Sequence, residues 1–96
     1  MQLEKLWVYK ASILVCDCRV EGHALALELG ISPRGWRLTL HGRNSAAHHH
    51  ALALVQRTSP TYRRIESARI VLDEWALGSD MAAICHTLRQ ALALLA

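Results

Sequence analysis

A chain of 96 residues that is 52% apolar and 20% charged is long enough to bury one small core. Its longest apolar run, at residues 91–96, is far shorter than the roughly 20 residues that a membrane-spanning helix requires. The apolar stretch near the start is too short for a signal-peptide core. A disulfide framework is not expected, because the number of cysteines is odd and Cys16 and Cys18 are too close together for an ordinary bridge. These features predict one domain over residues 1–96, in the cytoplasm, with reduced thiols and no membrane partner.

The formal net charge of +3 is distributed unevenly along the chain. Residues 34–69 carry seven arginines, no lysine and one carboxylate, a balance of +6, whereas the rest of the chain carries four basic and seven acidic side chains. Arginine presents a planar, permanently charged fork that suits carboxylate or phosphate groups. The asymmetry therefore predicts a docking surface for an acidic partner.

The first predicted element is a β-strand within residues 6–20, which are rich in β-branched, aromatic and cysteine side chains. A two-residue turn at Glu21-Gly22 would connect it to the next strand. In that register one set of side chains joins the leucines of the next strand, namely Leu14, Cys16 and Cys18, and a second set lies on the opposite face, namely Trp7, Tyr9, Ile13 and Val15. A helix over residues 2–18 is the alternative, because several apolar residues there approach helical spacing.

The clearest pattern is a β-hairpin over residues 25–40. Large apolar residues alternate on both sides of the turn at residues 32–35, which contains proline and glycine. A four-residue turn sets a register that opposes three apolar pairs: Ile31 with Trp36, Leu29 with Leu38, and Leu27 with Leu40.

About a dozen residues of the same segment suggest a competing interpretation. The run Ala26-Leu-Glu-Leu-Gly-Ile-Ser, with Trp36 five residues after Ile31, resembles the middle of a helix-turn-helix motif. That resemblance implies two helices and contact with DNA, whereas the alternation predicts two strands.

Three helices are predicted after the hairpin. The first begins after Asn44 or Ser45 and continues to about Arg57. The second has Ser59 as its N-cap and Pro60 at its first position, and it ends at Gly78. The third follows a cap at Ser79 and buries Ile84, Leu88, Ala91, Leu92 and Leu95. The predicted fold is an α+β domain, with a three-stranded antiparallel meander in residues 6–42 packed against three helices in residues 45–95.

The sequence offers little support for catalysis, a cofactor or a metal. On a helix the side chains of His48, His49 and His50 point in directions about 100° apart, so they do not converge on one metal ion. Cys16, Cys18 and His23 lack the spacing of a zinc knuckle. Cys85 and His86 are helical neighbours that cannot hydrogen-bond to each other as nucleophile and base. We therefore expect no enzymatic role, no cofactor and no bound metal.

The candidate binding residues are Arg34, Trp36, Arg37, Arg43, Arg57, Arg63 and Arg64. Some arginines have a carboxylate near them in the predicted elements. Arg37 would meet Glu28 diagonally across the hairpin. Along the second helix Arg63 and Arg69 would each pair with Glu66, and Arg69 would also reach Asp73. Arg34, Arg43, Arg57 and Arg64 have no such neighbour and are the strongest candidates.

These features favour a small non-enzymatic binding protein with a basic surface that docks on an acidic protein partner. Its size and composition are typical of a bacterial, phage or mobile-element accessory protein, or of a stoichiometric inhibitor of the anti-defence, anti-CRISPR-like class. The alternative is a nucleic-acid-binding protein, including a DNA-binding regulator, whose affinity would fall steeply with salt. A homo-oligomer that uses the exposed face of the first strand is a third hypothesis.

Overall fold

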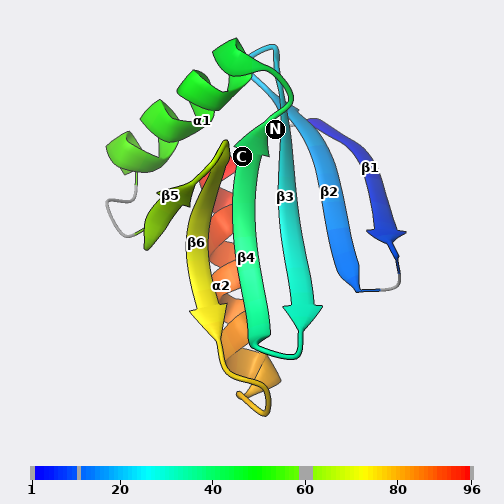
Figure 1. Ribbon diagram of the computed structural model, residues 1–96. Coiled ribbons are helices and arrows are strands. Elements are labelled where there is room, and N and C mark those ends of the chain that lie inside the picture. The colour runs from blue at the N-terminus through cyan, green and yellow to red at the C-terminus, as the bar shows by residue number, and fades with distance from the viewer. Residues whose placement is uncertain (1, 11, 59–61, 96) are drawn as a thin grey trace.

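The architecture is described by a computed structural model for residues 2–10, 12–58 and 62–95. The elements in chain order are β1 (Gln2–Tyr9), β2 (Ile13–Val20), β3 (His23–Ser32), β4 (Gly35–Gly42), α1 (Ser45–Thr58), β5 (Arg64–Glu66), β6 (Arg69–Trp75) and α2 (Met81–Leu95). The strands form one antiparallel sheet in the order β1-β2-β3-β4-β6-β5, with β1 and β5 at its edges (Figure 1). The fold is α+β, as predicted, but the described residues form six strands and two helices rather than three of each.

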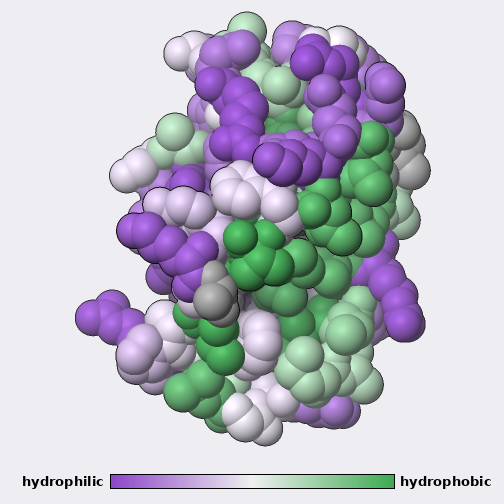
Figure 2. Space-filling view, turned by 90° about the vertical axis from the view of Figure 1, so that its right-hand side faces the viewer, coloured by the Kyte–Doolittle hydropathy of each residue, from purple (hydrophilic) through white to green (hydrophobic). Residues whose placement is uncertain are grey.

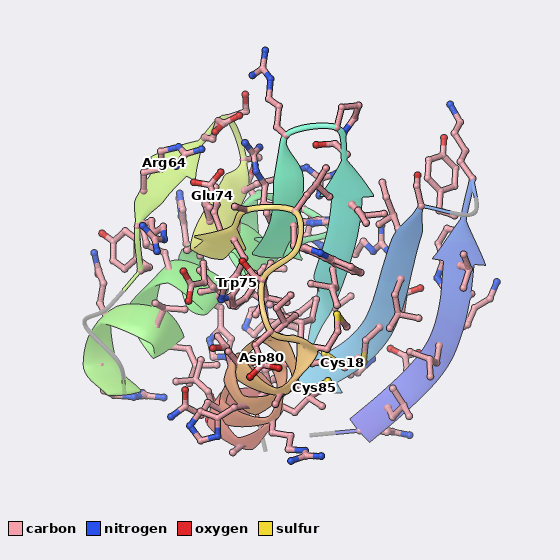
Figure 3. The ribbon with its side chains drawn as sticks, turned by 90° about the horizontal axis from the view of Figure 1, so that it is seen from below. Cys18, Arg64, Glu74, Trp75, Asp80 and Cys85 are labelled. Carbon is pink, nitrogen blue, oxygen red and sulfur yellow. The ribbon has the colours of Figure 1, made fainter. Side chains whose placement is uncertain are left out.

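Both helices pack on the same side of the sheet. The helix α1 follows β4 and packs on β3 and β4, while α2 lies behind β4 and β6 in the view of Figure 1. Seen from below, the sheet curves around α2 (Figure 3). We call this covered side the helix side and the other side the open face, because no described helix or strand lies over it.

Alternation along the strands places the leucines on the helix side. Leu25, Leu27, Leu38 and Leu40 are each at most 2% exposed. They pack in one core with small and aliphatic residues of both helices, Ala47, Ala51, Leu54, Val55, Ala91 and Leu95. Burial of these apolar surfaces is the main force that holds the helices on the sheet. The Cα radius of gyration of 12.6 Å is close to the roughly 12.5 Å of a compact globule of this length.

The predicted hairpin and its register are confirmed. Ile31 opposes Trp36, Leu29 opposes Leu38 and Leu27 opposes Leu40 in the pairing of β3 with β4. The segment that resembles a helix-turn-helix is thus extended strand, and that alternative is wrong. The expected alternation of β2 is also confirmed, because Cys16 opposes Leu27 and Cys18 opposes Leu25 on the helix side.

The first predicted strand is in fact two strands. The chain reverses between Tyr9 and Ile13, where Lys10 adopts a left-handed φ of 52°, and β1 then pairs antiparallel with β2. The helical alternative for residues 2–18 is wrong. Since Trp7 opposes Val15 and Tyr9 opposes Ile13, these four side chains share the open face, as the alternation predicted.

The largest error concerns the second predicted helix, whose described residues form the β5–β6 hairpin. A β-bulge explains the misleading pattern: Leu38 opposes Asp73 and Thr39 opposes Val71, so Leu72 is an extra residue. The bulge breaks the two-residue alternation of β6 and produces apolar spacings typical of a helix. The proposed caps of that helix, Ser59 and Pro60, lie outside the described residues.

The other two helices form where their patterns predicted. Asn44 Oδ1 accepts a hydrogen bond of 2.8 Å from the backbone N–H of Ala47 and so caps α1. At α2 the cap is Asp80 rather than Ser79, since Asp80 Oδ1 accepts 3.0 Å from the N–H of Ala82. Neither α1 nor α2 is long and apolar enough to cross a membrane, and the described chain has no other helix.

Candidate functional site

The open face is a narrow apolar strip framed by charged side chains. Four residues on it are at most 5% exposed although neither α1 nor α2 covers them: Val15, Ala26, Thr39 and Val71. The aliphatic stems of arginine side chains can cover apolar surface of this kind. Three groups of ion pairs follow one another across the face.

The first group lies at β2. Asp17 accepts 2.7 Å from the indole N–H of Trp7 on β1, and it pairs with Arg43 in the loop after β4. Partial burial alone would raise the pKa of Asp17, but the hydrogen bonds from Arg43 and Trp7 outweigh it and hold the pKa below its usual range. Asp17 is therefore charged at neutral pH and fixes the ring of Trp7.

The second group lies at the middle of the sheet. Arg69 of β6 pairs with Glu28 of β3, and its Nη1 lies 3.1 Å from Nδ1 of His41 on β4. The same His41 nitrogen is 3.2 Å from Glu28 Oε2. Burial, reinforced by the charge of Arg69, lowers the pKa of His41 despite the presence of Glu28. His41 is thus neutral at pH 7.

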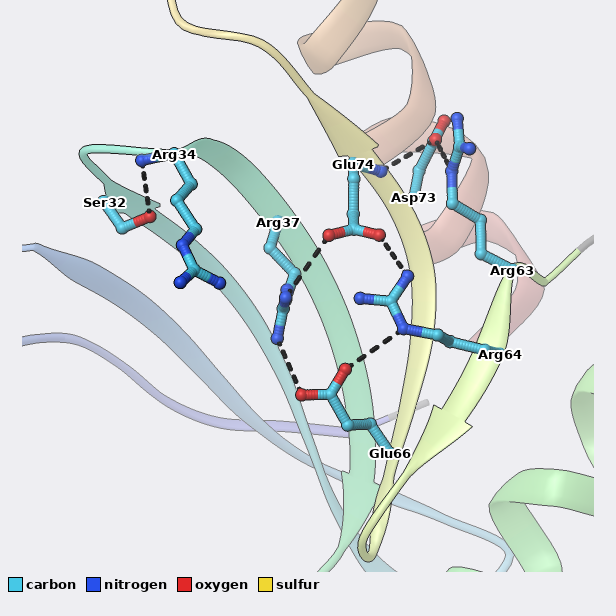
Figure 4. Close-up of polar contacts among 8 residues, drawn as sticks. All are labelled: Ser32, Arg34, Arg37, Arg63, Arg64, Glu66, Asp73 and Glu74. Carbon is cyan, nitrogen blue, oxygen red and sulfur yellow. Dashed lines mark hydrogen bonds and ion pairs between the residues drawn. The ribbon is translucent and has the colours of Figure 1, made fainter.

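The third group is a closed ring of two arginines and two glutamates (Figure 4). Arg37 of β4 donates 3.3 Å to each of Glu66 and Glu74. Arg64 of β5 donates 3.1 Å from Nε to Glu66 and also pairs with Glu74. The hydrogen bond from Arg64 is the main cause of a lowered pKa at Glu74, so Glu74 is ionised at neutral pH.

Next to this ring, at the tip of the β3–β4 hairpin, stands Arg34. Its backbone N–H donates 3.2 Å to Ser32 Oγ, and its guanidinium makes no ion pair with any described residue. Arg34 lines an open groove of about 790 Å³ together with Ile13, Gly30, Arg37 and Arg64. We call this the arginine groove.

Two features of the arginine groove follow from the strands that form it. Gly30 leaves it hollow, because a Cβ atom there would meet only Ile13, at 3.7 Å. Three arginines surround it against the two glutamates of the ring, so its formal charge is positive. Trp36 and Trp75 oppose each other on β4 and β6 at its end, but the register directs their side chains to the helix side, where Trp75 packs against the core. The guanidinium groups of Arg37 and Arg64 thus lie on the open face, and the two indole rings lie on the other side of the sheet.

Four of the seven predicted binding residues meet at the arginine groove: Arg34, Trp36, Arg37 and Arg64. The other three lie elsewhere. Arg57 is in the last turn of α1, Arg43 pairs with Asp17, and Arg63 pairs with Asp73 at 2.8 Å. The sequence thus predicted the residue types of the groove but not which of them come together.

Most of the predicted ion-pair partners are wrong. Arg37 contacts Glu66 and Glu74 rather than Glu28, which instead pairs with Arg69. Arg64, predicted to have no carboxylate neighbour, has two. Arg43 was likewise predicted to lack a carboxylate and pairs with Asp17. The reason is that strand pairing, not helical spacing, sets the neighbours of residues 63–75.

Sequence reasoning missed Glu66, Glu74 and Trp75 as parts of the site. A usable signal was present: Ile65, Ile70, Val71 and Trp75 favour a strand, and Ser67, with its left-handed φ of 57°, lies at the turn between two short runs. The interpretation as a helix concealed it.

The histidines and thiols form no comparable site in the described chain. His23 and His50 stack with ring centroids 4.3 Å apart, and His50 lies 3.5 Å from Glu21, but no three potential ligands converge among the residues described. Cys16 and Cys18 face the core, and burial raises the pKa of Cys18 to about 11. Their thiols are therefore protonated and weakly nucleophilic at neutral pH.

No family model, curated protein or solved structure matches this chain. The geometry of the site is therefore the feature of this chain that bears on its function.

Proposed function

We propose that this chain is a small non-enzymatic binding protein that docks the arginine groove on an acidic patch of a protein partner. The observation that carries the proposal is the meeting of Arg34, Arg37 and Arg64 at one end of the sheet, where the guanidinium of Arg34 makes no ion pair with any described residue. Arginine is among the side chains most enriched at the energetic centres of protein interfaces. The groove is hollow enough to admit a carboxylate-bearing loop.

The ion-pair ring supports this role because it fixes two of the three arginines before binding. Arg64 uses Nε and Nη1 toward Glu66 and Glu74, which leaves its Nη2 available among the described contacts. A partner carboxylate placed beside Arg34, with the ordered guanidinium of Arg37 next to it, would receive charge-assisted hydrogen bonds (Figure 4). Because the guanidinium of Arg64 is already ordered, less side-chain entropy is lost on binding.

The same ring favours a protein over a nucleic acid. Across the open face four arginines, Arg37, Arg43, Arg64 and Arg69, are matched by four carboxylates. A phosphate chain that follows this face would meet those carboxylates, whereas a protein patch can present both a carboxylate for Arg34 and donors for the glutamates. In this proposal the chain acts as an accessory protein or stoichiometric inhibitor, of the anti-defence type that size and composition suggest, by occupying the acidic patch of its target.

Affinity capture with quantitative mass spectrometry tests the proposal. The unmodified chain is compared with Arg34→Glu and with Arg89→Glu, which reverses an exposed arginine on α2. We expect a nuclease-resistant protein that is retained by the unmodified chain and by Arg89→Glu but lost with Arg34→Glu. Equal retention by both variants, or capture that nuclease abolishes, would contradict the proposal, and the latter would indicate nucleic-acid binding.

A further inference from the structure

The two edges of the sheet differ in how they meet solvent. The edge strand β5 is three residues long and places Arg64 and Glu66 beside its single aliphatic residue, Ile65. Short, charged edges of this kind discourage pairing with other chains. The opposite edge, β1, is eight residues long and hydrogen-bonds to β2 on one side only.

The β1 edge also exposes apolar side chains toward the helix side. Leu3, Leu6 and Val8 are 55%, 60% and 61% exposed, although Cys18 and Cys16, which oppose Leu3 and Leu6 on β2, are buried in the core. Figure 2 looks at this edge and shows hydrophobic side chains gathered across its centre and right. Neither α1 nor α2 reaches over β1 (Figures 1 and 3). An apolar edge of this length is unusual for a free surface.

We propose that β1 pairs antiparallel with β1 of a second copy of this chain, with the two-fold axis at Trp7. A two-fold axis perpendicular to the sheet keeps the helices of both copies on the same side of the joined sheet. Opposed residues must then point to the same face in each chain, so their residue numbers add up to an even number. With the axis at Trp7, opposed positions sum to 14. The two sheets then join into one continuous sheet.

This register matches side chains on both faces. Leu6 opposes Val8 of the other copy on the helix side, and Lys5 opposes Tyr9 on the open face, where a lysine and an aromatic ring attract each other. Trp7 opposes its own copy. Moving the axis to Leu6 would set the charged Glu4 against Val8, and moving it to Val8 would set Leu6 against Lys10, so neither alternative is complementary.

Charge complementarity at the ends of the ladder supports the same register. The β-bulge between Leu3 and Lys5 leaves Glu4 as the extra residue and limits regular pairing to residues 5–9. Immediately beyond this ladder, Glu4 of one copy meets Lys10 of the other, and the two-fold axis repeats the contact. Glu4 also pairs with Arg19 within its own chain, at 3.3 Å.

The aromatic side chains of β1 are already ordered for such an interface. The hydrogen bond to Asp17 holds the indole of Trp7, and Tyr9 packs edge-on against it with ring centroids 5.9 Å apart. Lys5 and Lys10 lie 5.1 and 5.3 Å from the rings of Trp7 and Tyr9. Little side-chain freedom is therefore left to lose on pairing.

Sedimentation velocity and light scattering at about 100 µM, a concentration that populates even a weak dimer, test the proposal. We expect a mass twice that of one chain. Val8→Lys should weaken the dimer by about tenfold or more, because Val8 of each copy opposes Leu6 of the other copy and the substitution therefore acts at two places in the interface. The matched control is Ile65→Lys, an exposed aliphatic residue of the other edge strand, which should leave the dimer unchanged. A monomer at this concentration, or a dimer that Ile65→Lys disrupts and Val8→Lys does not, would overturn the proposal.

A charge exchange tests the register itself. Glu4→Lys and Lys10→Glu should each weaken the dimer severalfold, and the double variant Glu4→Lys/Lys10→Glu should restore it. Circular dichroism shows whether each variant remains folded. A Trp7→Cys variant should in addition form a disulfide-linked dimer on mild oxidation, since opposed strand residues lie within disulfide range, whereas Tyr9→Cys should not. Failure of the rescue, or equal cross-linking of both cysteine variants, would exclude this register.

Discussion

The two faces of the sheet are held by different forces. The helix side is a dry layer in which Leu25, Leu27, Leu38 and Leu40 pack against both helices. The open face has an apolar strip of small side chains, over which arginines and carboxylates form ion pairs that remain partly exposed to water. Removing apolar area from water contributes far more stability than partly exposed ion pairs do. The helix side therefore holds the fold, and the open face is free to serve recognition.

The largest effect is expected on the helix side. Leu38 is fully buried, and Leu38→Ala should lower the free energy of unfolding by about 3 kcal/mol through lost burial and the cavity that remains. Urea denaturation followed by circular dichroism measures the change. Leu77→Ala, at a residue that is 52% exposed in the turn before α2, should change stability by less than about 0.5 kcal/mol. A similar loss in both variants would contradict the contrast between core and surface.

The next effect concerns the turn that forms the arginine groove. Gly35 has a φ of 130°, and a Cβ atom there would lie 2.1 Å from the backbone oxygen of Trp75. Gly35→Ala should cost about 2 kcal/mol or more and perturb tryptophan fluorescence, because β4 and β6 must separate at this point. Gly22→Ala is the control, since its φ of 82° is also left-handed but nothing lies within 4 Å. Equal losses of stability in both variants would show that the left-handed backbone conformation causes the loss and that the contact with Trp75 does not contribute.

A smaller effect is expected on the open face. Glu28→Gln weakens the contacts with Arg69 and His41, and because Glu28 is only 14% exposed the loss should be about 1 kcal/mol. The control change Glu21→Gln, at a side chain that is 64% exposed and lies 3.5 Å from His50, should cost less than about 0.5 kcal/mol. Thermal denaturation of the two variants at low and high salt measures the loss of stability in each. A loss at Glu28 as large as that of Leu38→Ala would overturn the ranking of the two faces.

The smallest effect is a pH dependence from His41. Its pKa in the folded protein is lowered by burial and by Arg69, so the unfolded chain binds a proton more readily. Stability should therefore fall as the pH drops from about 6.5 through the lowered pKa of His41, and His41→Gln should flatten this part of the profile. The carboxylates Asp17 and Glu74 also have lowered pKa values, but their contribution is lost only below about pH 4. Urea unfolding between pH 7.5 and 5, the range in which histidine titrates, separates the contribution of His41 from that of the two carboxylates. An unchanged slope in His41→Gln would refute the assignment.

The parts of the fold that the sequence predicted are those in which neighbours in the chain are neighbours in space. The β3–β4 register followed from its own alternation and turn, and Asn44 marked the start of α1. The break between β1 and β2 was missed because no glycine or proline marks it, and Lys10 adopts the left-handed conformation instead. In the candidate site the same limit applies: Arg34 was recognised beside its turn, whereas Glu66 and Glu74 were not connected with Arg37.

The amino-acid sequence by itself determined an α+β chain, the central hairpin and its register, both helices and an excess of arginine in the middle of the chain. Only the tertiary structure decided that residues 64–75 are strands and which carboxylates hold the arginines. The physical reason is distance along the chain: Arg37 meets Glu66 and Glu74 across 29 and 37 residues, and Arg69 meets Glu28 across 41. Local periodicity cannot encode such contacts. They form only after the strands have paired around the bulge in β6, because that pairing decides which side chains point to the open face.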